Sequence, residues 1–286
     1  MRLTTAFRQT LIDAGHSRPY INKLVAIIPR VFKWGASEEV VPPSIFQALR
    51  TVEGLKKGRT TAPETDPVLP VEDQVVDATL PFLPPVVADM VRFQRLTAAR
   101  PGEVCNLQPI DIDRSKPVWR YVPASHKTEH LGRQRVIFIG PQAQEILVPY
   151  LERGLESYCF SPRVSEVRRL KVRHLQRTTP NSNGNRPGTN VKRVKRQAPQ
   201  VQYTKDSYHR AIARAVVQAN KKRPQKQEEI PHWHPNQLRH TAATSVRSQF
   251  GLEAAQVILG HANAVVTQVY AERDIKLAER IIAQVG

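Results

Sequence analysis

The chain has 286 residues, of which 40% are hydrophobic and 24% are charged, a composition typical of a folded protein with one large domain or two smaller ones. Its net charge of +18 opposes compact folding unless a polyanion neutralises it, and this favours a nucleic-acid partner over a merely basic or ribosomal-type protein. The two cysteines form no disulfide framework or C-x-x-C motif, and no apolar run approaches the ~20 residues that span a bilayer. Because the first residues also lack the apolar run of a signal peptide, we expect a cytoplasmic protein.

The first part of the chain, residues 1–58, is predicted to form a small helical domain. Helices are expected over residues 6–14, 20–34 and 44–50. The second of these has the i, i+3, i+7 apolar spacing of an amphipathic helix, and Gly35 is expected to end it. Residues 59–70 are polar, contain prolines and lack periodicity, so we interpret them as a linker between domains.

The remainder, residues 71–286, is predicted to form a larger domain that is mainly α-helical with a small antiparallel β-sheet. The sheet is expected from β-rich runs at residues 118–122 and 135–139, which flank a polar turn and form a hairpin. A turn that leads into a helix is expected at residues 97–104. Further helices are expected over residues 71–97 with a break at Pro84 and Pro85, and over 142–151, 206–220, 237–250, 252–259, 265–271 and 275–285.

A strongly basic segment from about residue 163 to residue 200 interrupts the larger domain. It has a single acidic residue, Glu166, and its middle is rich in Ser, Asn, Gly and Pro. We interpret it as a mobile basic loop that contacts a nucleic-acid backbone, although a merely solvated loop would have the same composition. The candidate DNA-binding residues are Arg168, Arg169, Lys171, Arg173, Lys192, Arg193, Lys195 and Arg196.

A set of side chains along the larger domain is suited to cutting and rejoining DNA without a metal ion or ATP. A tyrosine can attack a phosphodiester and hold it as a covalent ester. Two arginines can stabilise the extra negative charge of the transition state, and a lysine or histidine can protonate the departing oxygen. The candidates, in chain order, are Arg100 in A-R-P-G-E-V, Lys127 in the hairpin turn, Arg239 in L-R-H-T-A-A-T, His261 in L-G-H, and Tyr270 nine residues later.

These motifs, in this order, resemble the catalytic domain of the tyrosine recombinases, also called phage-type integrases, from about residue 71 to the end of the chain. The resemblance implies a site-specific recombinase that forms a covalent 3′-phosphotyrosyl intermediate and needs no cofactor. Tyr270 would be the nucleophile, Arg100 and Arg239 would clamp the scissile phosphate, and Lys127 would be the general acid. By the same resemblance, His261 would donate to the phosphate, and Glu103 and His240 would hold the two arginines.

One position departs from the family pattern. The family usually has histidine three residues before the second arginine, where this chain has Asn236. Asparagine can donate a hydrogen bond to a phosphate oxygen but cannot act as an acid or base at neutral pH. The group that accepts the tyrosine proton is therefore unassigned, and His234 could replace it only if the local turn differs from that of the family.

The resemblance also implies partners. The N-terminal helices would form the core-binding domain, one jaw of a clamp on double-stranded DNA, and at residues 1–58 this domain is expected to be abbreviated or to lack part of its N-terminus. The tail helix after Tyr270 would dock on a neighbouring protomer in a synaptic tetramer. The target sequence, and the choice among integration, excision, inversion and dimer resolution, do not follow from these residues.

Two other functions are compatible with parts of the sequence. Asn236 and the short first domain would suit a catalytically weak DNA-binding protein derived from a recombinase. The triplet His232-Trp233-His234 resembles the metal site of rolling-circle relaxases, which nick DNA with a tyrosine. Because Pro231 and Pro235 bracket the triplet and no third ligand is evident, no metal site is predicted.

Overall fold

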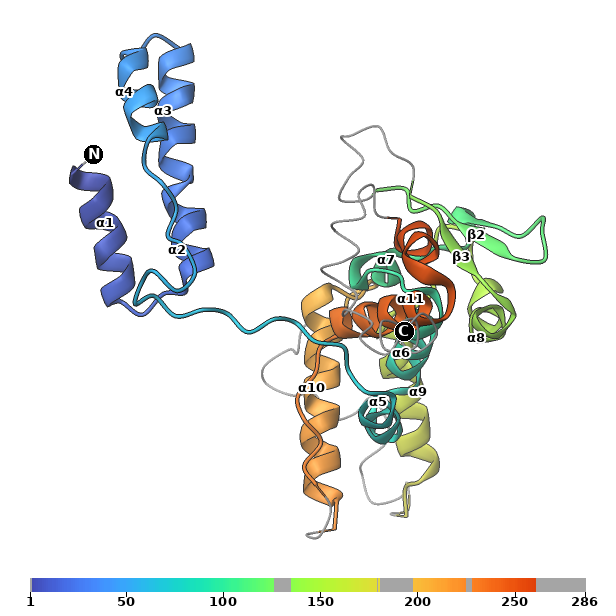
Figure 1. Cartoon of the computed structure of the whole chain (residues 1–286). Coiled ribbons are helices and arrows are strands. Elements are labelled where there is room, and N and C mark those ends of the chain that lie inside the picture. Colours follow the sequence, from blue (N-terminus) through green and yellow to red (C-terminus); the bar gives the residue numbers. More distant parts are fainter. Residues whose placement is uncertain (1, 126–134, 179, 181–197, 225–227, 261–286) are drawn as a thin grey trace, which may run out of the picture. The chain divides into compact units, whose positions relative to one another are not determined.

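The structure is a computed structural model of the chain and describes residues 2–125, 135–178, 180, 198–224 and 228–260. The chain divides into two compact units, Met1–Val68 and Leu69–Gly286, both drawn in Figure 1. Helices dominate the described residues, with one small antiparallel sheet, which confirms the predicted fold class. Within these ranges no helix is both long and apolar enough to cross a membrane.

The first unit is built from short helices. They are α1 (Arg2–Asp13), α2 (Arg18–Val25), α3 (Ile27–Ser37) and α4 (Pro43–Arg50). The prediction of one helix over residues 20–34 is wrong, because two helices meet at Ala26. The reason is Pro29, which has no N–H to donate to the carbonyl of Val25 and so sits best in a first helical turn.

Gly35 does not end α3 as predicted. It lies buried inside the helix, where a Cβ atom would come within 3.2 Å of the Val41 side chain. The glycine therefore permits close packing against the segment that follows α3. The core of this unit joins Ile21 and Val25 of α2 to Ala62, so part of the segment that we interpreted as a linker packs on the first unit.

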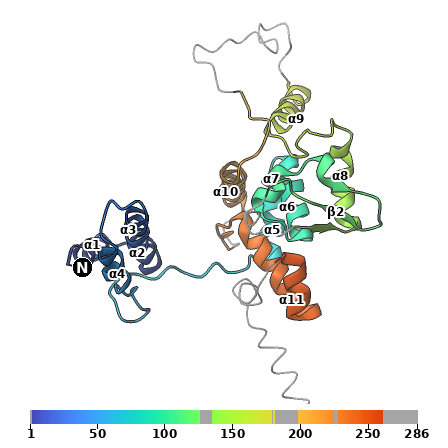
Figure 2. The same cartoon turned by 90° about the horizontal axis from the view of Figure 1, so that it is seen from above.

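The second unit is arranged around helix α6 (Pro85–Thr97), which packs against α7, α8, α9, α11 and the sheet. Figure 2 shows α8 and β2 on one side of α6 and α10 on the other. The helices of this unit are α5 (Asp73–Thr79), η1 (Leu80–Phe82), α6, α7 (Pro101–Asn106), η2 (Pro109–Asp111), α8 (Pro141–Leu151), α9 (Pro162–Leu175), α10 (Lys205–Lys222) and α11 (Pro235–Leu259). The predicted break at Pro84 and Pro85 is confirmed, because Pro85 begins α6.

The sheet consists of β1 (Ile112–Asp113), β2 (Trp119–Tyr121) and β3 (Ile137–Ile139) in the order β1-β2-β3. Strands β2 and β3 pair antiparallel, with Tyr121 opposite Ile137, so the predicted hairpin is confirmed. Its turn lies outside the described residues. Strand β1 was not predicted, because two residues are too few to establish an alternating pattern.

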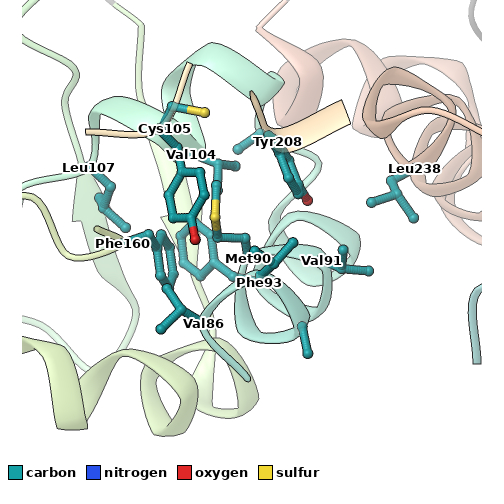
Figure 3. Packing of buried hydrophobic residues seen from close by; sticks show 14 of the residues in the cluster. Val86, Met90, Val91, Phe93, Val104, Cys105, Leu107, Phe160, Tyr208 and Leu238 are labelled. Carbon is teal, nitrogen blue, oxygen red and sulfur yellow. The ribbon is translucent and has the colours of Figure 1, made fainter. Parts of the chain in front are cut away.

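Apolar side chains of α6 fill the core of the second unit. Figure 3 shows Met90 and Phe93 of α6 packed with Val104 of α7 and with Phe160. The rings of Phe93 and Phe160 are 6.1 Å apart between centroids and tilted by 55°, a common arrangement for aromatic pairs. A helix that is apolar on most of its circumference must be buried, and α6 therefore provides the rigid support on which neighbouring turns are positioned.

The basic segment requires a correction. The prediction of a loop from about residue 163 is wrong for residues 163–175, because these form helix α9, with Pro162 in its first turn. Arg, Lys and Leu favour helices, and this stretch contains no glycine. Residues 181–197 of the segment lie outside the described part of the chain.

Helix α11 has the predicted interruption. Its two halves meet at Gly251, which takes the non-helical angles φ 86° and ψ 176°, so the boundary expected between residues 250 and 252 is confirmed. The helix ends at Leu259 and is followed by Gly260 in the left-handed region. The helices predicted over residues 265–271 and 275–285 lie outside the described residues.

Candidate active site

The turn between α6 and α7 positions Arg100. Ala98 adopts a left-handed conformation with φ 54° and ψ 19°, which ends α6, and Arg100 is extended at the N-cap of α7. Pro101 suits the first helical position because its ring presets φ. Glu103 occupies the third helical position, and its Oε2 accepts a hydrogen bond of 2.6 Å from the Arg100 backbone N–H. The A-R-P-G-E motif is thus a helix start that holds Arg100 in place with 26% of its side chain exposed.

Glu103 is a buried carboxylate, 5% exposed, that joins two arginines. Its Oε1 accepts hydrogen bonds from Arg100 Nη1 at 2.8 Å and from Arg135 Nε at 3.2 Å. Burial by itself would raise the pKa of Glu103, but the charge on Arg135 and the interactions with Arg100 outweigh it and hold the pKa below its ordinary value. The carboxylate is therefore ionised at neutral pH and fixes both guanidinium groups. The Tyr121 hydroxyl secures the same turn by donating to the Glu103 carbonyl at 2.9 Å.

Arg135 was not among the predicted site residues. It is 3% exposed, and its Nη1 donates to the Ile258 carbonyl at 3.2 Å, close to the end of α11. Two features of the sequence could have drawn attention to it. Arg135 has the same strand alternation as the buried Ile137 and Ile139, so its side chain must point inward, and a charge that points inward needs a buried partner.

Arg239 of α11 is 1% exposed and binds two backbone carbonyls. Its Nη1 donates to Ala98 O at 2.6 Å, and its Nη2 donates to Leu259 O at 2.6 Å. The first of these acceptors lies two residues before Arg100, although it is 141 positions from Arg239 in the sequence. The fold thereby brings the two predicted phosphate-binding arginines to the same region of the second unit.

A buried glutamine, Gln94 of α6, supports this convergence and was also missed. Its Nε2 donates to Ala99 O at 3.0 Å and to Pro235 O at 2.9 Å, and its Oε1 accepts from the Tyr208 hydroxyl at 3.0 Å. One fully bonded amide therefore ties the residue before Arg100 to the first residue of α11. A glutamine on the apolar face of a helix is the sequence signal that could have identified it.

Asn236 and His240 lie one turn apart at the start of α11. The Asn236 Nδ2 is 3.4 Å from the His240 Nε2, and the direction of any hydrogen bond depends on the histidine tautomer. Asn236 is partly buried and His240 is 6% exposed. The position that departs from the family pattern is thus in contact with a residue that was predicted to hold an arginine.

The His232-Trp233-His234 triplet leads into α11. Trp233 is buried, and its indole N–H donates to Thr79 Oγ1 at 3.2 Å. His234 is the N-cap of α11 and faces His209 with ring centroids 6.1 Å apart. Burial, and after it the nearby His209, lower the pKa of His234 from its ordinary value. Among the described residues, no group of three or more His, Cys, Asp or Glu side chains is arranged to hold a metal ion.

Three of the predicted catalytic residues, Lys127, His261 and Tyr270, lie outside the described residues. In the sequence, Lys127 lies between β2 and β3, and His261 directly follows Gly260. The described part of the site is therefore the pair of arginines with the groups that hold them.

The basic helix α9 carries four of the predicted DNA-binding residues. Arg169 forms a two-point ion pair with Glu166 at 2.7 and 2.8 Å, and the Arg168 guanidinium lies 5.5 Å from the centre of the Tyr150 ring. Lys171 and Arg173 are exposed. Lys192, Arg193, Lys195 and Arg196 lie outside the described residues.

Comparison with known proteins gives a family and a fold. The model of the phage integrase family matches residues 83–276. The structure of the Tn1549 transposon integrase (aa 82–397) in complex with circular intermediate DNA is 17% identical, covers 97% of this chain and 83% of that chain, and has a TM-score of 0.57. A lambda integrase (75–356) dimer bound to a COC′ core site is 14% identical, covers 95% of this chain and 79% of that chain, and has a TM-score of 0.59. No curated protein matches the chain.

Proposed function

Because the chain belongs to the phage integrase family of tyrosine recombinases, we propose that it is a site-specific DNA recombinase that works through a covalent 3′-phosphotyrosyl intermediate. In this proposal Tyr270 attacks the scissile phosphodiester, a bond forms between its oxygen and phosphorus, and the 5′-oxygen leaves. The reverse attack by a 5′-hydroxyl of another strand rejoins the DNA and releases the tyrosine. The covalent ester conserves the energy of the bond, so no ATP is consumed.

The observation that carries the proposal is the convergence of Arg100 and Arg239. Arg239 binds the carbonyl of Ala98, two residues before Arg100, and Arg100 is held by a carboxylate that is ionised and buried. Two guanidinium groups fixed in advance can stabilise the charge that develops on phosphate oxygens without reorganising at the moment of reaction. Because Arg239 is 1% exposed, the proposal requires that an edge of its guanidinium be uncovered for it to reach a phosphate.

The other roles in the proposal follow from chemistry and from the family. Lys127 protonates the departing 5′-oxygen, and His261 donates a hydrogen bond to the phosphate. Asn236 donates to a phosphate oxygen where the family has histidine, and Glu103 and His240 hold the arginines. The exposed basic face of α9 contacts the DNA backbone and adds affinity without sequence preference.

The partner in this proposal is double-stranded DNA. The similar Tn1549 and lambda integrases were both solved with DNA, the second as a dimer. We extend this to a DNA-associated cytoplasmic protein whose first unit forms one jaw of a clamp and whose protomers associate into a tetramer during strand exchange. The tail after Tyr270 provides the contact between protomers, so removing residues 276–286 should impair synapsis while unassembled protomers still bind DNA.

The decisive experiment is covalent trapping on a nicked duplex taken from the DNA that flanks the gene. A nick beside the cleavage point lets the short 5′-hydroxyl fragment diffuse away, and the protein stays attached to the 3′-end. Wild type should form an adduct that resists denaturant, Tyr270→Phe should form none, and the control Tyr158→Phe, a partly exposed tyrosine between α8 and α9, should match wild type. An adduct that persists with Tyr270→Phe would contradict the assignment of the nucleophile.

A second function, a catalytically weak DNA-binding protein, is favoured by Asn236. Without the family histidine at that position, the chain has no assigned acceptor for the tyrosine proton. Wild type that binds the nicked duplex but forms no adduct, while Asn236→His restores one, would support this second function over the first.

A further inference from the structure

We propose that Arg135 is a positioning residue that couples the setting of Arg100 to the last turn of α11. The inference rests on the proposed function, because it matters for catalysis only if Arg100 and the residues after Gly260 act on the same phosphate. It assigns a role to a side chain that belongs to none of the sequence motifs of the candidate site.

The contacts of Arg135 join two distant parts of the second unit. On one side, Nε donates to Glu103 Oε1 at 3.2 Å, the same oxygen that accepts from Arg100 Nη1 at 2.8 Å. On the other side, Nη1 donates to the Ile258 carbonyl at 3.2 Å. A single planar guanidinium therefore lies between the carboxylate that fixes Arg100 and the last turn of α11.

The last turn of a helix needs such a partner. The final carbonyls of an α-helix have no intrahelical donor, and the negative end of the helix dipole favours a cation there. In α11 the Gly260 N–H binds the carbonyls of Gln256 and Val257, and the last two carbonyls are divided between two arginines, since Arg135 binds Ile258 O and Arg239 binds Leu259 O. The end of α11, which precedes His261 in the sequence, is thus held by both guanidinium groups.

Gly260 fits this arrangement closely. A Cβ atom on Gly260 would lie 2.5 Å from Arg135 Nη1 and 3.2 Å from its Cδ. The guanidinium therefore packs directly on the backbone of Gly260. The φ of 61° at Gly260 also favours glycine. The glycine of the L-G-H motif is required here by the space that Arg135 occupies as well as by its own conformation.

Direct contact with DNA is a poor alternative for Arg135. The side chain is 3% exposed, and Nη2 is also buried, without a hydrogen-bond partner among the residues that the structure describes. A DNA phosphate would have to displace Glu103 or the last turn of α11 to reach the Arg135 guanidinium. The position of Arg135 suits mechanical support of the site rather than participation in the reaction.

The coupling can be measured on the free protein by hydrogen exchange at two places, residues 100–106 and residues 252–260. Glu103→Gln should speed exchange at the end of α11 by about threefold or more. The side chain of Glu103 binds Arg100 and Arg135, so the substitution would act on α11 by releasing Arg135. In an Arg135→Met background the same change should have no further effect on residues 252–260. Equal acceleration in both backgrounds would overturn the proposal, because the signal would then bypass Arg135.

Conservative variants keep the test decisive if Arg135→Met folds poorly. Arg135→Lys retains a charge for Glu103 but lacks the fork that reaches two acceptors at once, so exchange should accelerate at residues 252–260 and not at 100–106. The control is Arg153→Met, which removes a partly buried arginine that binds the Cys159 carbonyl away from the site. This control should leave the exchange rates of both segments unchanged. If Arg135→Lys protects both segments from exchange as well as wild type does, that result would count against the coupling.

Single-turnover trapping on the nicked duplex tests the catalytic consequence. Arg135→Lys and Gly260→Ala should slow adduct formation by about tenfold or more, as expected when reacting groups are misplaced, with DNA affinity changed less than about twofold. Loss of affinity without loss of rate would refute a positioning role. Wild type that forms no adduct would refute the proposed function alone, since the exchange measurements decide the coupling without DNA.

Discussion

Replacing the buried carboxylate of Glu103 by the amide of glutamine tests how the site is held together. Glutamine has almost the same shape, so the substitution removes charge and one acceptor without opening a cavity. The amide oxygen of glutamine can take the place of Oε1 and accept from the side chains of Arg100 and Arg135. The amide NH₂ then takes the place of Oε2 and faces the backbone N–H of Arg100, so two donors meet and this hydrogen bond is lost. The change therefore leaves Arg135 buried without a counterion and breaks the cap of α7.

The expected loss of stability follows from burial. The side chains of Glu103 and Arg135 are 5% and 3% exposed, so solvent screens their interaction little. Removing one partner from a buried pair costs about 3–5 kcal/mol, and we expect about 3 kcal/mol because the amide still accepts some of the hydrogen bonds. A domain of ordinary stability remains folded after a loss of this size.

The loss can be measured by urea unfolding followed by tryptophan fluorescence. The double variant Glu103→Gln/Arg135→Met removes both charges. Its loss of unfolding free energy should be smaller, by at least about 1 kcal/mol, than the sum of the losses of the two single variants, because the two side chains interact in a buried pair. Because the pKa of Glu103 is lowered in the folded chain, its contribution is complete above the unfolded value of 4.5 and is lost as the pH falls through the folded pKa. The gap between wild type and Glu103→Gln should therefore shrink in acid, and additive effects with a constant gap would refute the reasoning.

Two further predictions concern the residues around this core. Ala98 is left-handed, which costs a non-glycine residue about 1–2 kcal/mol, but its buried methyl group also packs with Ala243 and Leu259. Relief of the strain in Ala98→Gly is offset by the entropy of glycine, about 0.5–1 kcal/mol, and by loss of the methyl group, about 0.8 kcal/mol, so the stability in urea unfolding should change by less than about 0.5 kcal/mol. The control Ala88→Gly, inside α6 and without this strain, should destabilise the chain by at least about 1 kcal/mol, and equal losses in the two variants would contradict the strain argument. On α9, replacing Lys171 and Arg173 by alanine should flatten the plot of log affinity for duplex DNA against log salt by about 0.9 for each residue, measured by fluorescence anisotropy. An unchanged slope would mean that this face of α9 does not touch DNA.

Much of the fold could be predicted from the spacing of apolar residues and from the positions of proline and glycine. The break before Pro85, the β2–β3 hairpin and the interruption at Gly251 all depend on local signals, which are legible without the tertiary structure. The errors also have local causes. Pro29 lies inside an apolar pattern that otherwise predicts one continuous helix, and residues 163–175 have the high charge of a loop although their residue types favour a helix.

The sequence by itself determined the family and the candidate chemistry, because the proposed nucleophile, the two arginines and the histidine lie in short motifs whose order is specific. Only the tertiary structure showed what holds the arginines. Arg239 binds the carbonyls of Ala98 and Leu259, and every residue has a carbonyl, so such acceptors leave no signature in the sequence. Arg135 was one of many basic residues until the fold buried it against Glu103, since burial turns an ordinary surface charge into one that must be paired.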